Sequence, residues 1–194
     1  MLLKQEKRKE DPRIKRTRQL LHQAFLELMR EKSFQEITIQ DISERATVNR
    51  VTFYAHFLDK YALLEYSTRE IFKERLYNHL PESAPFTHEN LATLIRVLCE
   101  FLGEMNRVCP APRGQMDSLI EKQIKETVYE ILLTWLEGLP LSNPDNTEQK
   151  AMIIAWAIYG AAVLWSQKTR PEPVNDFVQQ ILPIILASLN VQIA

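Results

Sequence analysis

The sequence TIQDISERATVNRVTFYAHFLDK, residues 38–60, contains the features that decide the fold. Its spacing predicts two short helices joined by a tight turn at residues 47 and 48. Thr38 and Asp41 match a capping box, in which each side chain accepts a hydrogen bond from the backbone N–H of the other residue. Asn49 follows the turn and is a favourable N-cap for the second helix.

The apolar positions of these two helices are expected to face the interior of the domain; they are Ile39, Ile42, Ala46, Val51, Phe53 and Phe57. The outward positions of the second helix carry a dense row of hydrogen-bonding side chains: Arg50, Thr52, Tyr54 and His56. A short helix with such a face suits the major groove of DNA, so the segment predicts a helix-turn-helix.

Residues 34–63 follow the pattern F-x-x-I-T-I-x-D-I-x-x-x-A-x-V-x-x-x-T-F-Y-x-H-F-x-D-K-x-x-L. This pattern closely resembles the DNA-binding domain of the tetracycline-repressor (TetR) family. The resemblance is specific over about residues 13–66, and beyond them it is one of layout. The family usually has glycine where this chain has Thr47. A threonine there either takes a positive φ at an energetic cost or closes the turn differently.

The polar residues of this segment have two interpretations, a solvated surface or a DNA-binding face. The resemblance favours the second, because several of them match family positions that contact DNA. Arg50 can donate two hydrogen bonds to guanine, and Gln40 can pair with adenine. Thr38, His56 and Lys60 have the character of phosphate contacts. The predicted DNA-binding residues are Thr38, Gln40, Asn49, Arg50, Thr52, Tyr54, His56 and Lys60.

The composition favours a mostly α-helical soluble protein. The chain has 194 residues, of which 45% are hydrophobic and 25% are charged, and only 4 are glycine. Its net charge of −1 is unevenly distributed. Residues 1–80 carry 16 basic and 12 acidic side chains, against 8 and 13 in residues 81–194. This asymmetry is expected when only the N-terminal part meets a polyanion.

Nothing in the sequence indicates export or a membrane partner. Charged residues follow Met1 almost at once, so no secretory signal is expected. The longest uncharged apolar run, residues 151–166, is shorter than the roughly 18–20 residues that cross a bilayer. Two cysteines give no disulfide framework. We therefore expect a cytoplasmic protein.

The predicted fold class is all-α, with an N-terminal three-helix helix-turn-helix domain followed by a larger helical effector-binding and dimerisation domain. The expected divisions are a DNA-binding domain at 1–58 with a basic arm at 1–12, a connecting helix at 59–80, and a regulatory domain at 81–194. Residues 81–87 read as the linker. The arm is either a solvated tail or a segment that lies along DNA phosphates or in a minor groove. Further helices are expected at 12–32, 89–107, 116–137, 150–168 and 174–189.

The last two predicted helices are apolar on nearly every side. Either they are central helices of the domain, or a second copy of the chain covers them in a two-fold four-helix interface. The resemblance favours the second alternative, because the corresponding helices of the family form the dimer interface. The residues expected there are Ala157, Ala161, Trp165, Phe177, Ile181 and Ile185.

Aromatic side chains are concentrated in the C-terminal part. They are either core residues or the lining of an apolar pocket with polar tips inside. The resemblance implies a small effector between these helices, which we expect to be apolar or aromatic. The residues assigned to its pocket are Phe101, Met105, Tyr129, Trp135, Trp156 and Tyr159.

No chemistry-bearing cluster supports an enzyme. The sequence shows no pairing of nucleophile and base, no phosphate-binding loop and no paired acids. Cys99 and Cys109 lie ten residues apart without a ligand-like histidine pair, so no metal and no cofactor are expected.

The sequence as a whole predicts a homodimeric TetR-type regulator, most simply a repressor. Its two helix-turn-helix units would bind successive major grooves of a near-palindromic operator in double-stranded DNA, roughly 34–36 Å apart. A small-molecule effector would release it by linkage. The alternative is a protein of the same fold that acts through a protein partner rather than a small ligand.

Overall fold

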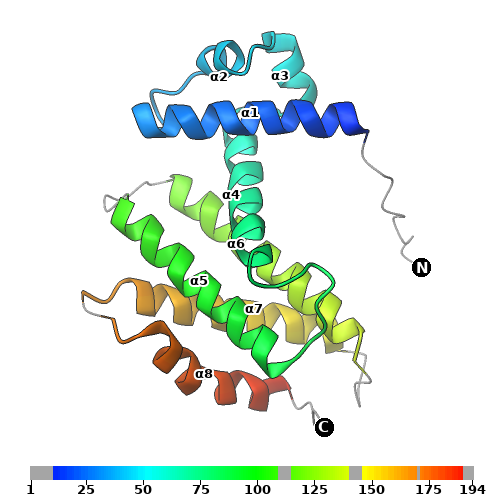
Figure 1. Cartoon of the computed structure of the whole chain (residues 1–194), viewed down its shortest axis with the longest axis vertical. Helices are drawn as coiled ribbons and strands as arrows, with labels where there is room; N and C mark the ends of the chain where they lie inside the picture. Colours follow the sequence, from blue (N-terminus) through cyan, green and yellow to red (C-terminus); the bar gives the residue numbers. More distant parts are fainter. Residues whose placement is uncertain (1–10, 109–114, 140–145, 170, 190–194) are drawn as a thin grey trace. The chain divides into compact units, whose positions relative to one another are not determined.

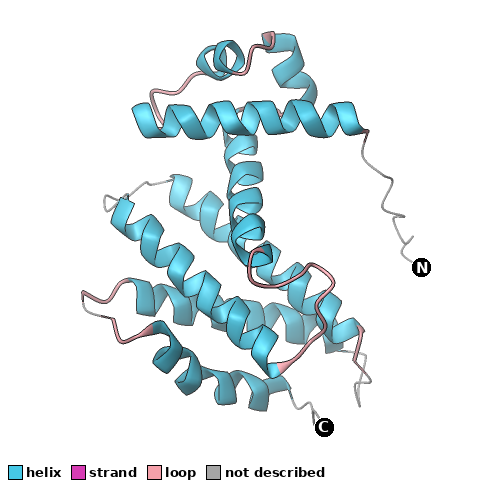
Figure 2. Cartoon of the chain, in the orientation of Figure 1, coloured by secondary structure: helices cyan, strands magenta, loops and turns pink. Residues whose placement is uncertain are grey.

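The computed structural model describes residues 11–108, 115–139, 146–169 and 171–189 (Figure 1). The arm before residue 11, residues 109–114 with Cys109, and residues 140–145 between the helices expected at 116–137 and 150–168 lie outside the described residues. The described part consists of helices joined by loops and contains no strand (Figure 2). Its helices are α1 Pro12–Glu31, α2 Ile39–Arg45, α3 Arg50–His56, α4 Lys60–Tyr77, α5 His88–Val108, α6 Gln115–Glu137, α7 Thr147–Ser166 and α8 Val174–Leu189. The prediction of an all-α fold is confirmed.

The chain forms two compact units, Met1–Ser67 and Thr68–Ala194. The division falls inside α4, whereas the sequence suggested a linker at 81–87. That segment belongs to the second unit, where Phe86 is buried and its ring meets Trp135 with the centroids 6.0 Å apart. The Thr87 hydroxyl oxygen accepts a hydrogen bond from the backbone N–H of Asn90 and thereby caps α5. The prolines around it therefore shape an anchored loop.

The first unit is held together by one apolar cluster. Asp11 caps α1 by accepting a hydrogen bond from the Arg13 N–H, and Pro12 occupies the first turn, where its missing N–H costs nothing. In Figure 1, α2 and α3 lie on the same side of α1. The buried apolar side chains that join these helices to the start of α4 are Leu21, Phe25, Leu28, Phe34, Ile37, Ile42, Phe53, Phe57 and Leu63.

The second unit is a bundle in which α7 packs against α5, α6 and α8, and α5 packs against both α7 and α8. The later part of α4 meets α5 through the rings of Phe72 and Phe101, whose centroids are 5.4 Å apart. It meets α6 through long polar side chains, because Arg69 and Lys73 both pair with Glu130 at 3.2 and 3.6 Å.

Helices α7 and α8 each bury only one face within the chain. α7 buries a stripe of small and branched residues that includes Ile154, Ile158 and Ala162. α8 buries Phe177 and Ile185 and continues through Pro183. Among the described residues, no helix combines the length and apolar character needed to span a membrane.

Candidate nucleic-acid interface

The start of α2 is fixed by the predicted capping box. The Thr38 hydroxyl oxygen accepts from the Asp41 N–H at 3.1 Å, and the Asp41 carboxylate accepts from the Thr38 N–H at 2.8 Å. The ammonium of Lys32 also donates to this carboxylate at 2.7 Å. The Thr38 hydroxyl donates to the same carboxylate at 2.8 Å, and the bonds from Lys32, the Thr38 N–H and this hydroxyl lower the pKa of Asp41 to about 2. The carboxylate therefore stays charged at any pH at which the protein would work.

At the end of α2, Thr47 occupies the turn position at which the family usually has glycine. Thr47 has a φ of 56°, so it adopts the left-handed conformation itself. The Val48 N–H donates to the Ser43 carbonyl at 2.9 Å, and the Thr47 N–H donates to the Glu44 carbonyl at 3.1 Å. These two bonds are those of a Schellman motif, which normally places glycine at the left-handed position. The turn keeps its geometry, and a β-branched residue bears the strain.

The helix α3 is positioned by its cap and by two aromatic side chains. The Asn49 side-chain oxygen accepts from the Thr52 N–H at 2.7 Å and from the Thr52 hydroxyl at 3.0 Å. Phe53 and Phe57 are buried on the inner side, one helical turn apart. Their burial fixes which side of α3 faces solvent.

The outer face of α3 differs from the prediction at one position. Val51 was expected to point inward, but its side chain is 78% exposed, so that prediction is wrong. The reason is helical geometry, because Val51 lies about 160° around the helix from Phe53. The outward row therefore begins with Arg50 and Val51 and continues to Tyr54, which is also exposed.

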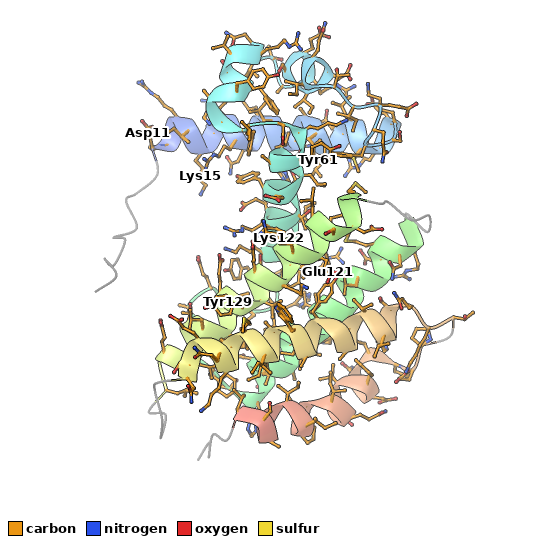
Figure 3. The ribbon with its side chains drawn as sticks, turned by 180° about the vertical axis from the view of Figure 1, so that it is seen from behind. Asp11, Lys15, Tyr61, Glu121, Lys122 and Tyr129 are labelled. Atoms are coloured by element: carbon orange, nitrogen blue, oxygen red, sulfur yellow. The ribbon has the colours of Figure 1, made fainter. Side chains whose placement is uncertain are left out.

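The remaining predicted contact residues are placed unevenly. The Gln40 amide is exposed on α2 and donates to Glu44 at 2.8 Å. Thr38 is exposed, and His56 is half-buried near the end of α3. Basic residues at the beginning of α1, among them Arg13, Lys15 and Arg16, are exposed as well, and Figure 3 labels Lys15 close to Asp11.

Lys60 has a different environment from the one expected of a phosphate contact. Its ammonium nitrogen donates to the backbone carbonyls of Phe34, Gln35 and Ile37 at 2.9, 3.0 and 2.8 Å. It also lies 4.8 Å from the centre of the Phe34 ring. All three N–H donors of an ammonium are thereby used, and burial lowers the pKa of Lys60. Within this structure Lys60 clamps the α1–α2 loop.

The salt bridges of the first unit also favour a rigid scaffold. Arg45 of α2 donates two parallel hydrogen bonds of 2.8 Å to the carboxylate of Glu31 on α1. Glu27 lies 3.4 Å from the same guanidinium. These contacts are partly exposed, so each contributes modestly to stability, but the forked geometry restricts how α2 can rotate on α1.

The helices of the second unit contain an open groove of about 540 Å³ between α6 and α7. Two of the six residues predicted for an effector pocket, Tyr129 and Trp156, line it. Phe101 and Trp135 are instead buried core residues that meet Phe72 and Phe86. The groove residues that the sequence did not single out are Ser118, Glu121, Lys122, Lys125, Glu126, Glu148, Gln149 and Met152.

The other two predicted pocket residues, Met105 and Tyr159, are partly exposed and lie outside the lining of this groove. Polar residues of the groove were missed because the prediction counted only aromatic side chains and one methionine. The spacing of residues 118, 122, 125, 126 and 129 along α6 places them on one helical face, and that signal could have found them.

The predicted dimer residues fall into two groups. Phe177 and Ile185 are buried within the chain, and Trp165 is held by a hydrogen bond from its indole N–H to the Glu172 carbonyl at 3.0 Å. Ala157 is exposed, and Ala161 and Ile181 are half-buried. The most exposed apolar residues on these helices were not among the predicted dimer residues; they are Ile153, Trp156, Leu164 and Ile184. Helical spacing places the first three on the side of α7 away from Ile154 and Ile158, and that spacing could have identified them.

A metal-binding cluster does not emerge from the described residues. Within them, no group of three or more histidine, cysteine or acidic side chains could hold a metal ion. Cys99 is buried in α5, and its burial, together with the neighbouring Glu100, raises the pKa of its thiol to about 12. A thiol with that pKa is a poor nucleophile.

A capped α2, a Schellman turn and an outward polar face on α3 define a helix-turn-helix of the DNA-binding class. Residues 21–66 match the family model described as "Bacterial regulatory proteins, tetR family". An uncharacterized HTH-type transcriptional regulator of Bacillus subtilis, YxbF, is 44% identical over 62 residues. That match covers 31% of this chain and 16% of the relative's length.

Solved structures share the fold over most of the chain. A TetR-family regulator from Streptomyces coelicolor is 14% identical with a TM-score of 0.61, covering 94% of this chain and 99% of its own. A second regulator from that organism is 17% identical with a TM-score of 0.56, covering 89% and 99%. Thermus thermophilus FadR, a repressor crystallised with lauroyl-CoA, is 23% identical with a TM-score of 0.50, covering 91% and 97%. These likenesses establish the fold. The match over residues 21–66 shows a TetR-type DNA-binding segment, and the likenesses to solved structures extend the shared fold over most of the chain.

Proposed function

We propose that the chain is a homodimeric repressor that binds a near-palindromic operator in the cytoplasm and is released by a small-molecule effector. The observation that carries the DNA-binding part is the outer face of α3. The buried side chains of Phe53 and Phe57 hold one side of α3 against the interior of the unit. The other side carries Arg50, Val51 and Tyr54, which are exposed to solvent. Val51 is 78% exposed, and Tyr54 is 54% exposed although its edge-on aromatic contact with Phe53 brings the two ring centroids to 5.7 Å.

The outward side chains suit distinct tasks in a major groove. Arg50 has the planar donors that match guanine O6 and N7. Val51 is an exposed branched apolar residue, which suits contact with the methyl group of thymine. Thr38, His56 and the exposed basic residues of α1 suit phosphate contacts, which fix the register without reading sequence. Lys60 is assigned to the scaffold, because its donors already bind three carbonyls.

The homodimer is supported by apolar residues that a single chain leaves uncovered. On α7, Ile153, Ala157 and Leu164 share one outward stripe, and Leu164 is 67% exposed. Gly160 lies on the same stripe, and a methyl group added to it would meet nothing within 4 Å. On α8, Ile184 is 68% exposed. Covering such a stripe with a second copy is favourable by roughly 25 cal/mol per Å² of apolar area removed from water.

The effector is supported by the groove between α6 and α7. Its volume of about 540 Å³ lies within the range of small-molecule sites, roughly 300–1,000 Å³. An effector that binds one conformation of the second unit more tightly than another would change operator affinity by linkage. Thermus thermophilus FadR was crystallised with lauroyl-CoA, but at 23% identity the effector class has to be argued from this chain's own groove.

Selection of operators from random duplex DNA tests this function. The purified chain should enrich a near-palindromic sequence whose half-site centres lie roughly 34–36 Å apart, because each subunit of a dimer reads one major groove. Arg50→Ala should still bind DNA but lose preference at one base pair in each half-site. Failure of the chain to enrich any sequence at low salt would contradict the proposal.

A second candidate is regulation through a protein partner. The exposed side chains of Leu164 and Ile184 would favour this candidate if a different protein, and not a second copy of the chain, covered them. Sedimentation of the purified chain separates the two candidates. A dimer at micromolar concentration supports the homodimeric regulator, and a monomer favours the partner.

A further inference from the structure

The groove between α6 and α7 has an apolar wall that the chain leaves in contact with water. Tyr129 contributes to it from α6, and Met152 and Trp156 contribute from α7. The Trp156 side chain is 60% exposed, although tryptophan is rarely left in solvent without a reason. On α7 this wall lies on the flank next to the proposed dimer stripe, because Met152 and Trp156 each precede a residue of that stripe. Figure 3 labels Tyr129 on α6, in the same helix as Glu121 and Lys122.

The rim of the groove has more negative than positive side chains. It carries three carboxylates, from Glu121, Glu126 and Glu148, and two ammonium groups, from Lys122 and Lys125. The ammonium groups are already matched on α6, since Lys125 lies 2.8 Å from Glu121 and Lys122 lies 4.0 Å from Glu126. Within the described residues, Glu148 has no ion pair. The groove therefore presents an uncompensated negative charge beside its aromatic wall.

The neighbouring tyrosines respond to this charge. Burial raises the pKa of Tyr129, and Glu148 and Glu137 raise it further. Burial also raises the pKa of Tyr159 to about 12, with a smaller contribution from Glu121. Both phenols thus stay neutral, and the negative charge of the rim resides on carboxylates alone.

The chain already places one of its own cations on the aromatic wall. The Lys125 ammonium lies 4.7 Å from the centre of the Trp156 ring and 5.7 Å from that of Tyr159. Aromatic faces combined with a carboxylate are the means by which proteins recognise alkylated ammonium ligands. Lys125 is a flexible side chain held by a partly exposed ion pair, so a ligand cation can displace it at little cost.

We propose that this groove binds an organic cation and that this cation is the effector. Its apolar body lies against Tyr129, Met152 and Trp156, and its charge takes the position of the Lys125 ammonium or sits beside Glu148. The acidic rim excludes anionic molecules of the same size. The inference that the groove binds a cation depends only on the groove residues, whereas the cation's role as effector rests on the proposed function.

The test is a titration of the full-length chain with benzyltrimethylammonium, followed by calorimetry and tryptophan fluorescence. Neopentylbenzene, in which carbon replaces the charged nitrogen, is the neutral isostere, and lauroyl-CoA is the anionic comparison. We expect the cation to bind about tenfold more tightly than the isostere, and lauroyl-CoA not to compete with it.

Four variants separate a binding site from a structural cluster. Glu148→Gln should weaken cation binding about tenfold, and Trp156→Leu should abolish it, with helicity unchanged because both side chains are exposed. Lys125→Gln should strengthen binding, since it removes the internal competitor, and a merely structural lysine would not give this gain. Glu89→Gln, an equal charge change at the exposed start of α5, is the matched control and should leave binding unchanged.

Equal binding of the cation and its isostere, or weaker binding by Lys125→Gln, would overturn the site. Operator affinity is measured separately with the same ligand. If the cation binds the groove and leaves operator affinity unchanged, the site is supported and its effector role is overturned. If the chain binds no operator at all, the proposed function fails while cation binding in the groove still stands.

Discussion

Replacement of Lys60 by methionine distinguishes a scaffold role from a DNA contact. The variant keeps the apolar stem and removes three N–H donors from the carbonyls of Phe34, Gln35 and Ile37. The bonds to Phe34 and Ile37 are part-buried, so two carbonyls lose a partner that water replaces only in part. At roughly 1–3 kcal/mol for each buried unsatisfied group, and offset by the relief of ammonium desolvation, the expected loss of unfolding free energy is about 2–4 kcal/mol.

Urea unfolding followed by circular dichroism measures that loss. All three tryptophans, at positions 135, 156 and 165, lie in the second unit, so their fluorescence provides a separate record of that unit. Hydrogen exchange at residues 34–63 should localise the effect to the first unit. Lys15→Met, at an exposed lysine of α1, is the control and should change stability by less than about 0.5 kcal/mol. The scaffold role would be refuted by two results together: an unchanged unfolding free energy of Lys60→Met, and a plot of log binding constant against log salt concentration whose slope is shallower by about one.

Four further predictions concern the turn, the cap, the DNA face and the dimer. Thr47→Gly should stabilise the first unit by about 0.5–1 kcal/mol, because relief of roughly 1–2 kcal/mol of left-handed strain exceeds the entropy cost of glycine; a lower urea midpoint would speak against this. The pKa of Asp41 is lowered from 3.8 to about 2, so its contribution to stability is present above pH 4 and disappears as the pH falls towards 2; Asp41→Asn should remove that part of the acid sensitivity in urea midpoints measured across this range. If Val51 contacts a thymine methyl, replacing one operator thymine with uracil should weaken the parent and leave Val51→Ala unaffected, and equal losses in both would exclude the contact. Leu164→Asp should give a folded monomer in sedimentation, since the residue is exposed in the single chain but buried in the proposed dimer; a persistent dimer would move the interface elsewhere.

Local features of the fold could be predicted from the sequence because neighbouring residues determine them. The Thr38–Asp41 capping box and the Asn49 cap join groups three residues apart, and both are present as expected. The connecting helix expected from residue 59 is also capped locally, because the Asp59 carboxylate accepts from the Ala62 N–H at 2.8 Å. The helical periodicity gave most helix ends to within a few residues for the same reason.

Features that depend on distant residues were less accessible. Lys60 meets carbonyls 23 to 26 residues earlier in the chain, and no local pattern indicates that clamp. Val51 was misplaced because α3 has only 7 residues, too few for periodicity to define its inner face. The groove depends on how α6 and α7 pack, so its acidic rim and the position of Lys125 over Trp156 emerged only from the structure.

The central claim is that the outer face of α3 binds operator DNA. Its most direct measurement compares the affinity of the parent and of an Arg50→Ala, Tyr54→Ala double variant for the selected operator and for an unrelated duplex, at one salt concentration. We expect the variant to lose about 100-fold or more on the operator, because Arg50→Ala removes a base contact worth roughly 1–3 kcal/mol in each half-site and Tyr54→Ala removes a further DNA contact, while the variant stays folded because both side chains are largely exposed. Parent-like operator affinity in the folded variant would contradict the account.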